Sequence, residues 1–152
     1  MTTVQARLDQ LGIVLPPPFP PAGNYLSCSQ LGSTLYVGGH GPVHGDEVVT
    51  GKVGRDLTLD EARRAARLTG LSILATVHQE LGDLDRVARI VKVFGMVNVA
   101  PGFNQTPAVI DGCSDLMVEV FGDKGRHARS TIGVPSLPLD SAVEVEALVE
   151  VA

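Results

Sequence analysis

The chain has 152 residues, of which 44% are hydrophobic, and a formal net charge of −5 at pH 7. This length suits one domain, and the hydrophobic content excludes a disordered chain. The acidic balance offers no basic surface for nucleic acid, and no apolar run is long enough to cross a membrane. We therefore expect neither nucleic-acid nor membrane partners. We also expect a cytoplasmic location, because residues 1–11 lack the apolar core of a signal peptide.

Residues 1–22 are predicted to form a segment distinct from the rest. The stretch 3–11 has the apolar spacing of a short helix. The proline-rich run 16–21 is expected to lie extended over the surface, because successive prolines break regular structure. Residues 23–152 then form a single domain.

The first half of that domain is predicted to contain short strands and one long helix. The strand-like runs lie at 25–30, 34–37 and 47–53. The helix is expected over 58–81, because Thr58 and Glu61 have the spacing of a capping box and apolar residues follow at helical intervals.

The second half begins with a central strand, predicted over 86–99 because that run is apolar on both faces. Residues 101–107 are expected to form a loop. A second helix is predicted over 113–121, with a polar start at 114–115 and Gly122 just past its end.

The end of the chain has two alternating runs, at 129–134 and 142–151, around a proline-containing connection. After the first helix the full order is strand, strand, a short strand, helix, strand, helix and two strands. This order predicts an α+β fold with two helices on one face of a mainly antiparallel sheet. The other sheet face is then either exposed or packed against another subunit.

Folded as a hairpin, the last two strands would put Arg129 opposite Glu146 and Thr131 opposite Glu144 on one face. A fixed guanidinium beside a carboxylate can bind a substrate anion and place a water molecule. The alternative is a cross-strand ion pair on a solvated face, worth at most about 1 kcal/mol.

These motifs resemble the Rid (YjgF-like) family, whose members are also known as L-PSP-type endoribonucleases and are related in fold to a trimeric chorismate mutase. The resemblance covers residues 24–151. It rests mainly on Ala128-Arg-Ser130 followed by Val143-Glu-Val-Glu-Ala147, with support from Gly23-Asn-Tyr25, Leu31-Gly32, Gly39 and Pro42.

The resemblance implies a homotrimer in which three sheets form a central barrel, with pockets between subunits. It also implies hydrolysis of small enamine or imine carboxylates to a 2-oxo acid and ammonia, without a cofactor or a metal. By the same resemblance, Arg129 grips the substrate carboxylate and Glu144 helps to activate water. The other expected pocket residues are Tyr25, Gly38, Gly39, Ser114, Ser130 and Thr131.

The chain departs from the family pattern at three of these positions. Thr131 stands where members usually have Cys, and Gly38 where they have Ser. Ser114 is the nearest match to the family's helix-start Asn. Two alternatives to a deaminase stay open. One is a non-catalytic regulatory trimer that binds small carboxylates, and the other is an endoribonuclease, which the acidic charge and the scarcity of aromatic residues disfavour.

For each of five further side chains, the sequence leaves two alternative roles open. His40 and His127 are either pocket residues or structural. Asp115 and Glu119, four apart on a predicted helix, are either paired pocket carboxylates or surface groups. Cys113 is either a thiolate stabilised near a helix start or a buried, inert thiol. The cysteines and histidines show no metal-ligand spacing.

Overall fold

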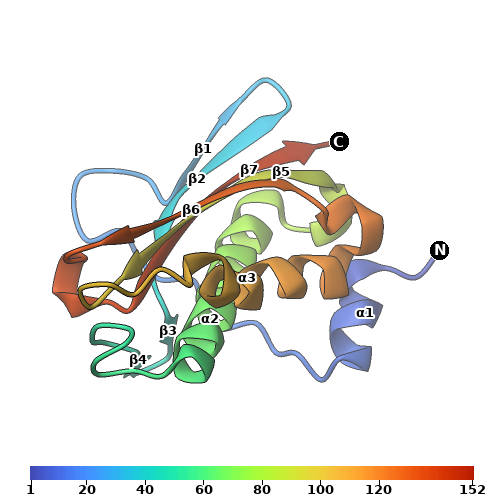
Figure 1. The fold of residues 1–152 in the computed structure, drawn as a ribbon. Coiled ribbons are helices and arrows are strands. Elements are labelled where there is room, and N and C mark those ends of the chain that lie inside the picture. The colour runs from blue at the N-terminus through green and yellow to red at the C-terminus, as the bar shows by residue number, and fades with distance from the viewer.

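The computed structural model describes all 152 residues and has two layers, with helices packed on one face of a five-stranded sheet (Figure 1). The strands, in their order across the sheet, are β1 (Cys28–Leu31), β2 (Thr34–His40), β7 (Val143–Val151), β5 (Val87–Asn98) and β6 (Ala128–Val134). All neighbours are antiparallel except β5 and β6, which are parallel. The predicted α+β fold with a mainly antiparallel sheet is confirmed.

The remaining elements lie below the sheet or at its ends in Figure 1. The helices are α1 (Val4–Gln10), α2 (Leu59–Leu81) and α3 (Thr106–Phe121), and a small ribbon is formed by β3 (Val43–His44) and β4 (Glu47–Val48). Short 3₁₀ turns occur at Leu84–Arg86, Gly122–Gly125 and Pro138–Asp140. No helix combines the length and apolar character that crossing a bilayer requires.

The long helix α2 begins and ends at the local signals that the sequence carries. The Thr58 hydroxyl accepts the backbone N–H of Glu61 at 3.2 Å, as a capping residue does. Gly82 closes the helix in the left-handed region, at φ 76°. The predicted bounds of this helix are therefore confirmed.

The two long helices approach each other closely because glycines lie at their contact. A Cβ on Gly70 of α2 would be 2.8 Å from the Leu116 side chain of α3. A Cβ on Gly112 of α3 would be 2.0 Å from the carbonyl oxygen of Arg63. This close packing fixes α3 against α2 and so fixes the side chains that α3 presents to the sheet.

The N-terminal helix α1 packs against α3 and joins the same core. Leu8 is 2% exposed within the main hydrophobic cluster. Arg7 Nε donates to the carbonyl oxygen of Glu119 at 2.8 Å. The predicted helix is confirmed, and the run 16–21 has no regular structure.

Two predictions about the second half of the chain are wrong. The strands β6 and β7 do not form a hairpin, because β5 lies between them and pairs with both. The connection from β5 through α3 returns β6 parallel to β5, as in a βαβ unit. The helix predicted over 113–121 begins earlier, at Thr106, and residue 107 is a proline in its first turn, where the missing amide costs no helical hydrogen bond.

Candidate functional site

Arg129 and Glu144 lie on opposite faces of the sheet, which corrects the prediction that they share one face. Arg129 of β6 pairs with Val93, which is 0% exposed beneath the helices. Glu144 of β7 alternates with the buried residues Val143 and Val145, and therefore points to the uncovered face. Within one chain, these two groups cannot contact the same small molecule.

On the helix-covered face, Arg129 is held by α3. Its Nη1 donates to Asp111 Oδ1 at 2.8 Å and to Ser114 Oγ at 3.1 Å. The Arg129 side chain is 23% exposed, and neither its Nε nor its Nη2 donates a hydrogen bond to another group of the chain. A guanidinium held in this way has its Nε–Nη2 edge free for the two oxygens of a carboxylate.

Thr131 follows on the same face and meets the start of α3. Its Oγ1 lies 3.0 Å from Thr106 Oγ1. Ser130, by contrast, pairs with Phe94 and lies exposed on the uncovered face. The chain therefore separates two adjacent residues that were both expected in the pocket. We call Arg129, Asp111, Ser114, Thr131 and Thr106 the arginine half-site.

Ser114 does not begin a helix, so its assignment to the family's helix-start position is wrong. It lies well inside α3, between Arg129 and His127. Its Oγ is 2.9 Å from His127 Nε2, and His127 Nδ1 is 2.6 Å from the carbonyl oxygen of Gly125. Burial and the positive charge of Arg129 together lower the pKa of His127, more than its contact with the Gly125 carbonyl raises it.

On the uncovered face, Glu144 lies over a bulge in β2. The register between β2 and β7 shifts between Val37 and His40, where Gly38 and Gly39 stand. A Cβ on Gly39 would be 2.9 Å from Glu144 Cδ, so the carboxyl group rests directly on this glycine. Burial raises the pKa of Glu144, and the negative charge of Glu146 raises it further. A raised carboxyl pKa suits a group that exchanges protons near neutral pH.

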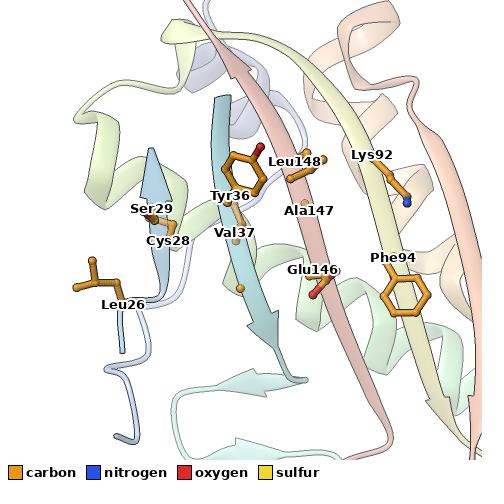
Figure 2. Close-up of a pocket in the computed structure, with 11 residues that line it drawn as sticks. Leu26, Cys28, Ser29, Tyr36, Val37, Lys92, Phe94, Glu146, Ala147 and Leu148 are labelled. Atoms are coloured by element: carbon orange, nitrogen blue, oxygen red, sulfur yellow. The ribbon is translucent and has the colours of Figure 1, made fainter. Parts of the chain in front are cut away.

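Beside this carboxyl, the uncovered face is hollowed. A cavity of about 410 Å³ crosses β1, β2, β7 and β5 (Figure 2). Most of its lining is apolar, and its charged groups are Lys92 and Glu146. Tyr25, which is 60% exposed, immediately precedes Leu26 in this lining. We call Glu144, Gly38, Gly39 and this cavity the glutamate half-site.

Several side chains for which the sequence left two alternatives have structural or surface positions. His40 is 7% exposed, with its ring nitrogens 2.7 Å from the Gly38 carbonyl oxygen and 2.8 Å from Thr76 Oγ1. Glu119 forms an ion pair with Arg67 at 3.0 Å, between α3 and α2. Asp115 is exposed, and burial raises the pKa of the Cys113 thiol to about 12. No group of three His, Cys, Asp or Glu side chains is arranged to hold a metal ion.

Sequence reasoning missed Asp111 and Thr106. Both lie in the first half of α3, which was predicted as loop and unassigned chain. The signal that could have revealed them is the pair Thr106 and Pro107, a polar residue and a proline of the kind that often opens a helix. Extending the helix to that point would have put Asp111 one turn before Ser114.

The sequence matches one family model over residues 5–151, which is described as "YjgF/chorismate mutase-like, putative endoribonuclease". Protein TCP17 of Trypanosoma cruzi is 45% identical over 149 residues, covering 97% of this chain and 93% of that protein. The 2-iminobutanoate/2-iminopropanoate deaminase of Dermatophagoides farinae is 32% identical over 131 residues, covering 85% and 87%.

A solved structure extends this similarity to the whole fold. The Agrobacterium tumefaciens protein Atu1372 superposes with a TM-score of 0.91 at 40% identity, covering 98% of this chain and 92% of that one. The coverage includes the N-terminal helix as well as the sheet. From these matches, the chain belongs to the YjgF/chorismate mutase-like family.

Proposed function

We propose that this chain is a cofactor-free deaminase that hydrolyses small enamine or imine carboxylates in pockets between the subunits of a homotrimer. The observation that carries the proposal is the separation of Arg129 and Glu144. One face of the sheet has an anchor suited to a carboxylate, and the other has a shielded carboxyl with a raised pKa. The deaminase named among the relatives supports this reaction class.

Both half-sites serve one substrate only when they come from different copies. The arginine half-site lies along β6, which pairs with β5 alone and so is an edge strand. The glutamate half-site lies on the uncovered sheet face, beside the cavity. Docking the edge of one copy near the uncovered face of the next would bring Arg129 to Glu144, and closed cyclic symmetry would repeat the pocket at each interface.

The reaction needs a placed water and a proton acceptor. In the protonated imine of a 2-oxo acid, the water oxygen attacks the carbon of the C=N bond while Glu144 accepts a proton from that water. Glu144 then returns this proton to the nitrogen of the resulting carbinolamine. As the C–N bond breaks and ammonia leaves, the carbinolamine hydroxyl gives its proton to Glu144 and becomes the carbonyl group of the 2-oxo acid. Arg129 holds the substrate carboxylate throughout, so the imine carbon stays near the water.

The test is ammonia release from 2-iminobutanoate generated in situ by an amino acid oxidase, compared with spontaneous hydrolysis of the same imine. The proposal predicts acceleration by the wild-type protein. No acceleration across a panel of small and bulky imine carboxylates would contradict it. Carboxylate binding without turnover would instead favour a non-catalytic regulatory trimer.

A further inference from the structure

The guanidinium of Arg129 is fixed from one side only. Nη1 carries two hydrogens and has two recorded acceptors, Asp111 Oδ1 at 2.8 Å and Ser114 Oγ at 3.1 Å. A guanidinium is planar, so two bonds at Nη1 set the orientation of the whole group. The hydrogen on Nε and one of the two hydrogens on Nη2 share the opposite edge, and neither Nε nor Nη2 has a partner in the chain.

The contact at Ser114 is itself directed by His127. The Gly125 carbonyl oxygen can only accept a hydrogen bond, so His127 Nδ1 carries the hydrogen in their 2.6 Å contact. In neutral imidazole, Nε2 then has a lone pair and accepts the Ser114 hydroxyl hydrogen across 2.9 Å. This leaves the Ser114 oxygen with lone pairs for Arg129. The hydrogen bonds therefore run in one direction, from Arg129 through Ser114 and His127 to the Gly125 carbonyl.

The end of this series is firmly placed. A Cβ on Gly125 would be 2.1 Å from the carbonyl oxygen of Met117, so the Gly125 backbone packs directly on α3. Asp111 and Ser114 also belong to α3, which is locked against α2 at Gly112. The groups around Nη1 are thus attached to one rigid element.

We propose that Asp111, Ser114 and His127 are positioning residues that fix Arg129 at Nη1, so that its Nε–Nη2 edge is presented to the substrate carboxylate. The inference rests on the proposed function, because it assigns these residues to the carboxylate anchor of that site. It gives Asp111 a role opposite to the one that charge alone would give it. A nearby carboxylate should repel a carboxylate ligand, whereas a positioning carboxylate should favour its binding.

The first test measures binding of 2-oxobutanoate by calorimetry, together with KM and kcat for 2-iminobutanoate. Ser114→Ala changes no charge and removes one hydrogen bond, so we expect about three- to tenfold weaker binding. KM should rise with kcat nearly unchanged, because the anchor acts on ground state and transition state alike. Ser114→Thr keeps the hydroxyl and should restore most of the affinity, and His127→Ala should resemble Ser114→Ala.

Asp111→Ala gives the sharpest contrast. Positioning predicts weaker binding although the site becomes more positive, and tighter binding would overturn the proposal. The matched control is Glu119→Gln. Glu119 is another carboxylate of α3 and forms an ion pair with Arg67 at 3.0 Å, and its side chain is about as exposed as that of Asp111. This control should alter stability about as much as Asp111→Ala does, and leave KM unchanged.

The second test needs no ligand. Nuclear magnetic resonance of ¹⁵N-arginine-labelled protein should show separate, slowly exchanging Nη signals for Arg129, because rotation about its Nε–Cζ bond is hindered. Those signals should average in Ser114→Ala and Asp111→Ala and stay separate in Glu119→Gln. Averaged signals in the wild-type protein would overturn the proposal.

The two failures are distinguishable. If Arg129→Ala loses 2-oxobutanoate while Ser114→Ala and Asp111→Ala bind it as the wild type does, positioning is refuted and the carboxylate anchor stands. If the wild-type protein neither binds nor hydrolyses these carboxylates, the proposed function fails. The resonance experiment then still decides whether the guanidinium is held.

Discussion

Adding one methyl group at Gly39 should displace Glu144 without unfolding the protein. The new Cβ would lie 2.9 Å from Glu144 Cδ and 3.0 Å from Oε2, whereas ordinary contact begins at 3.4 Å. The carboxyl group must therefore shift by at least about half an ångström. It is the end of a flexible side chain, so the cost in folding free energy should stay within about 1 kcal/mol.

The shift should be visible in the reaction. A misplacement of about 1 Å can cost about a hundredfold in rate, so half that distance should lower kcat by roughly tenfold. KM should change little, because the carboxylate anchor Arg129 is contributed by another copy and its contacts with Asp111 and Ser114 are untouched by the substitution. The assay is steady-state ammonia release from 2-iminobutanoate, with thermal unfolding measured on the same preparation.

The neighbouring glycine supplies the control. A Cβ on Gly38 would be 3.4 Å from the Ser27 carbonyl oxygen, which is ordinary contact, so Gly38→Ala should leave Glu144 in place and lower kcat far less than Gly39→Ala does, although it adds a methyl group to the cavity lining. Wild-type kcat in Gly39→Ala would refute the argument that the carboxyl must rest on this bulge. Unfolding of Gly39→Ala would refute the argument that the side chain yields rather than the backbone.

Three further predictions follow from the same contacts. Arg129→Ala should weaken 2-oxobutanoate binding, measured by calorimetry, by about 1.5–3 kcal/mol while the oligomer survives. Arg129→Lys should restore only part of that binding energy, because the planar fork of the guanidinium is lost. Unchanged affinity in Arg129→Ala would show that Arg129 does not anchor the carboxylate. Burial lowers the pKa of His40 and of His127 below the usual 6.5, so the unfolded chain binds more protons in acid. The free energy of unfolding should reach its full value above about pH 6.5 and decrease as the pH drops below it. His40→Gln should make the unfolding temperature depend less steeply on pH, and the same slope in this variant and the wild type would contradict the argument. Gly112→Ala would put a Cβ 2.0 Å from the Arg63 carbonyl oxygen, so urea unfolding should show a loss of about 1–3 kcal/mol or more, and wild-type stability would contradict the close packing of α2 and α3.

The elements that follow from local chemistry could be predicted from the sequence. Thr58 and Glu61 mark the start of α2 because a capping hydroxyl needs only the next three residues, and Gly82 marks its end for a similar reason. The alternation in β7 likewise reports which side chains are buried. These signals depend on neighbours in the chain, so they need no knowledge of the fold.

The pairing of strands depends on contacts between distant segments, and there the prediction failed. The alternation in β6 and β7 is the same whether they pair with each other or with β5 between them. The helix predicted over 113–121 leaves Pro107 in a loop and starts seven residues after α3 does, which conceals the contact of Asp111 with Arg129. The site residues therefore stay predictions, and their predicted arrangement was wrong: across β5, Arg129 aligns with Ala147 and not with Glu146, which puts it on the other face of the sheet from Glu144.

In the proposed oligomer, Arg129 of one copy and Glu144 of another serve the same pocket. Glu144→Gln keeps the shape of the side chain but cannot accept a proton, so alone it should lower kcat by about 10²–10⁴-fold. Arg129→Ala alone should also be nearly inactive at low substrate. In oligomers assembled at random from equal amounts of the two variants, about one quarter of the pockets should combine an intact arginine with an intact glutamate.

The decisive measurement is therefore the ammonia-releasing activity of the two variants after they are unfolded and refolded together. A pocket shared between copies predicts recovery of about one quarter of the activity of wild-type protein treated in the same way. A mixture no more active than the sum of the separately refolded variants, while the refolded wild type is active, would contradict a pocket shared between copies.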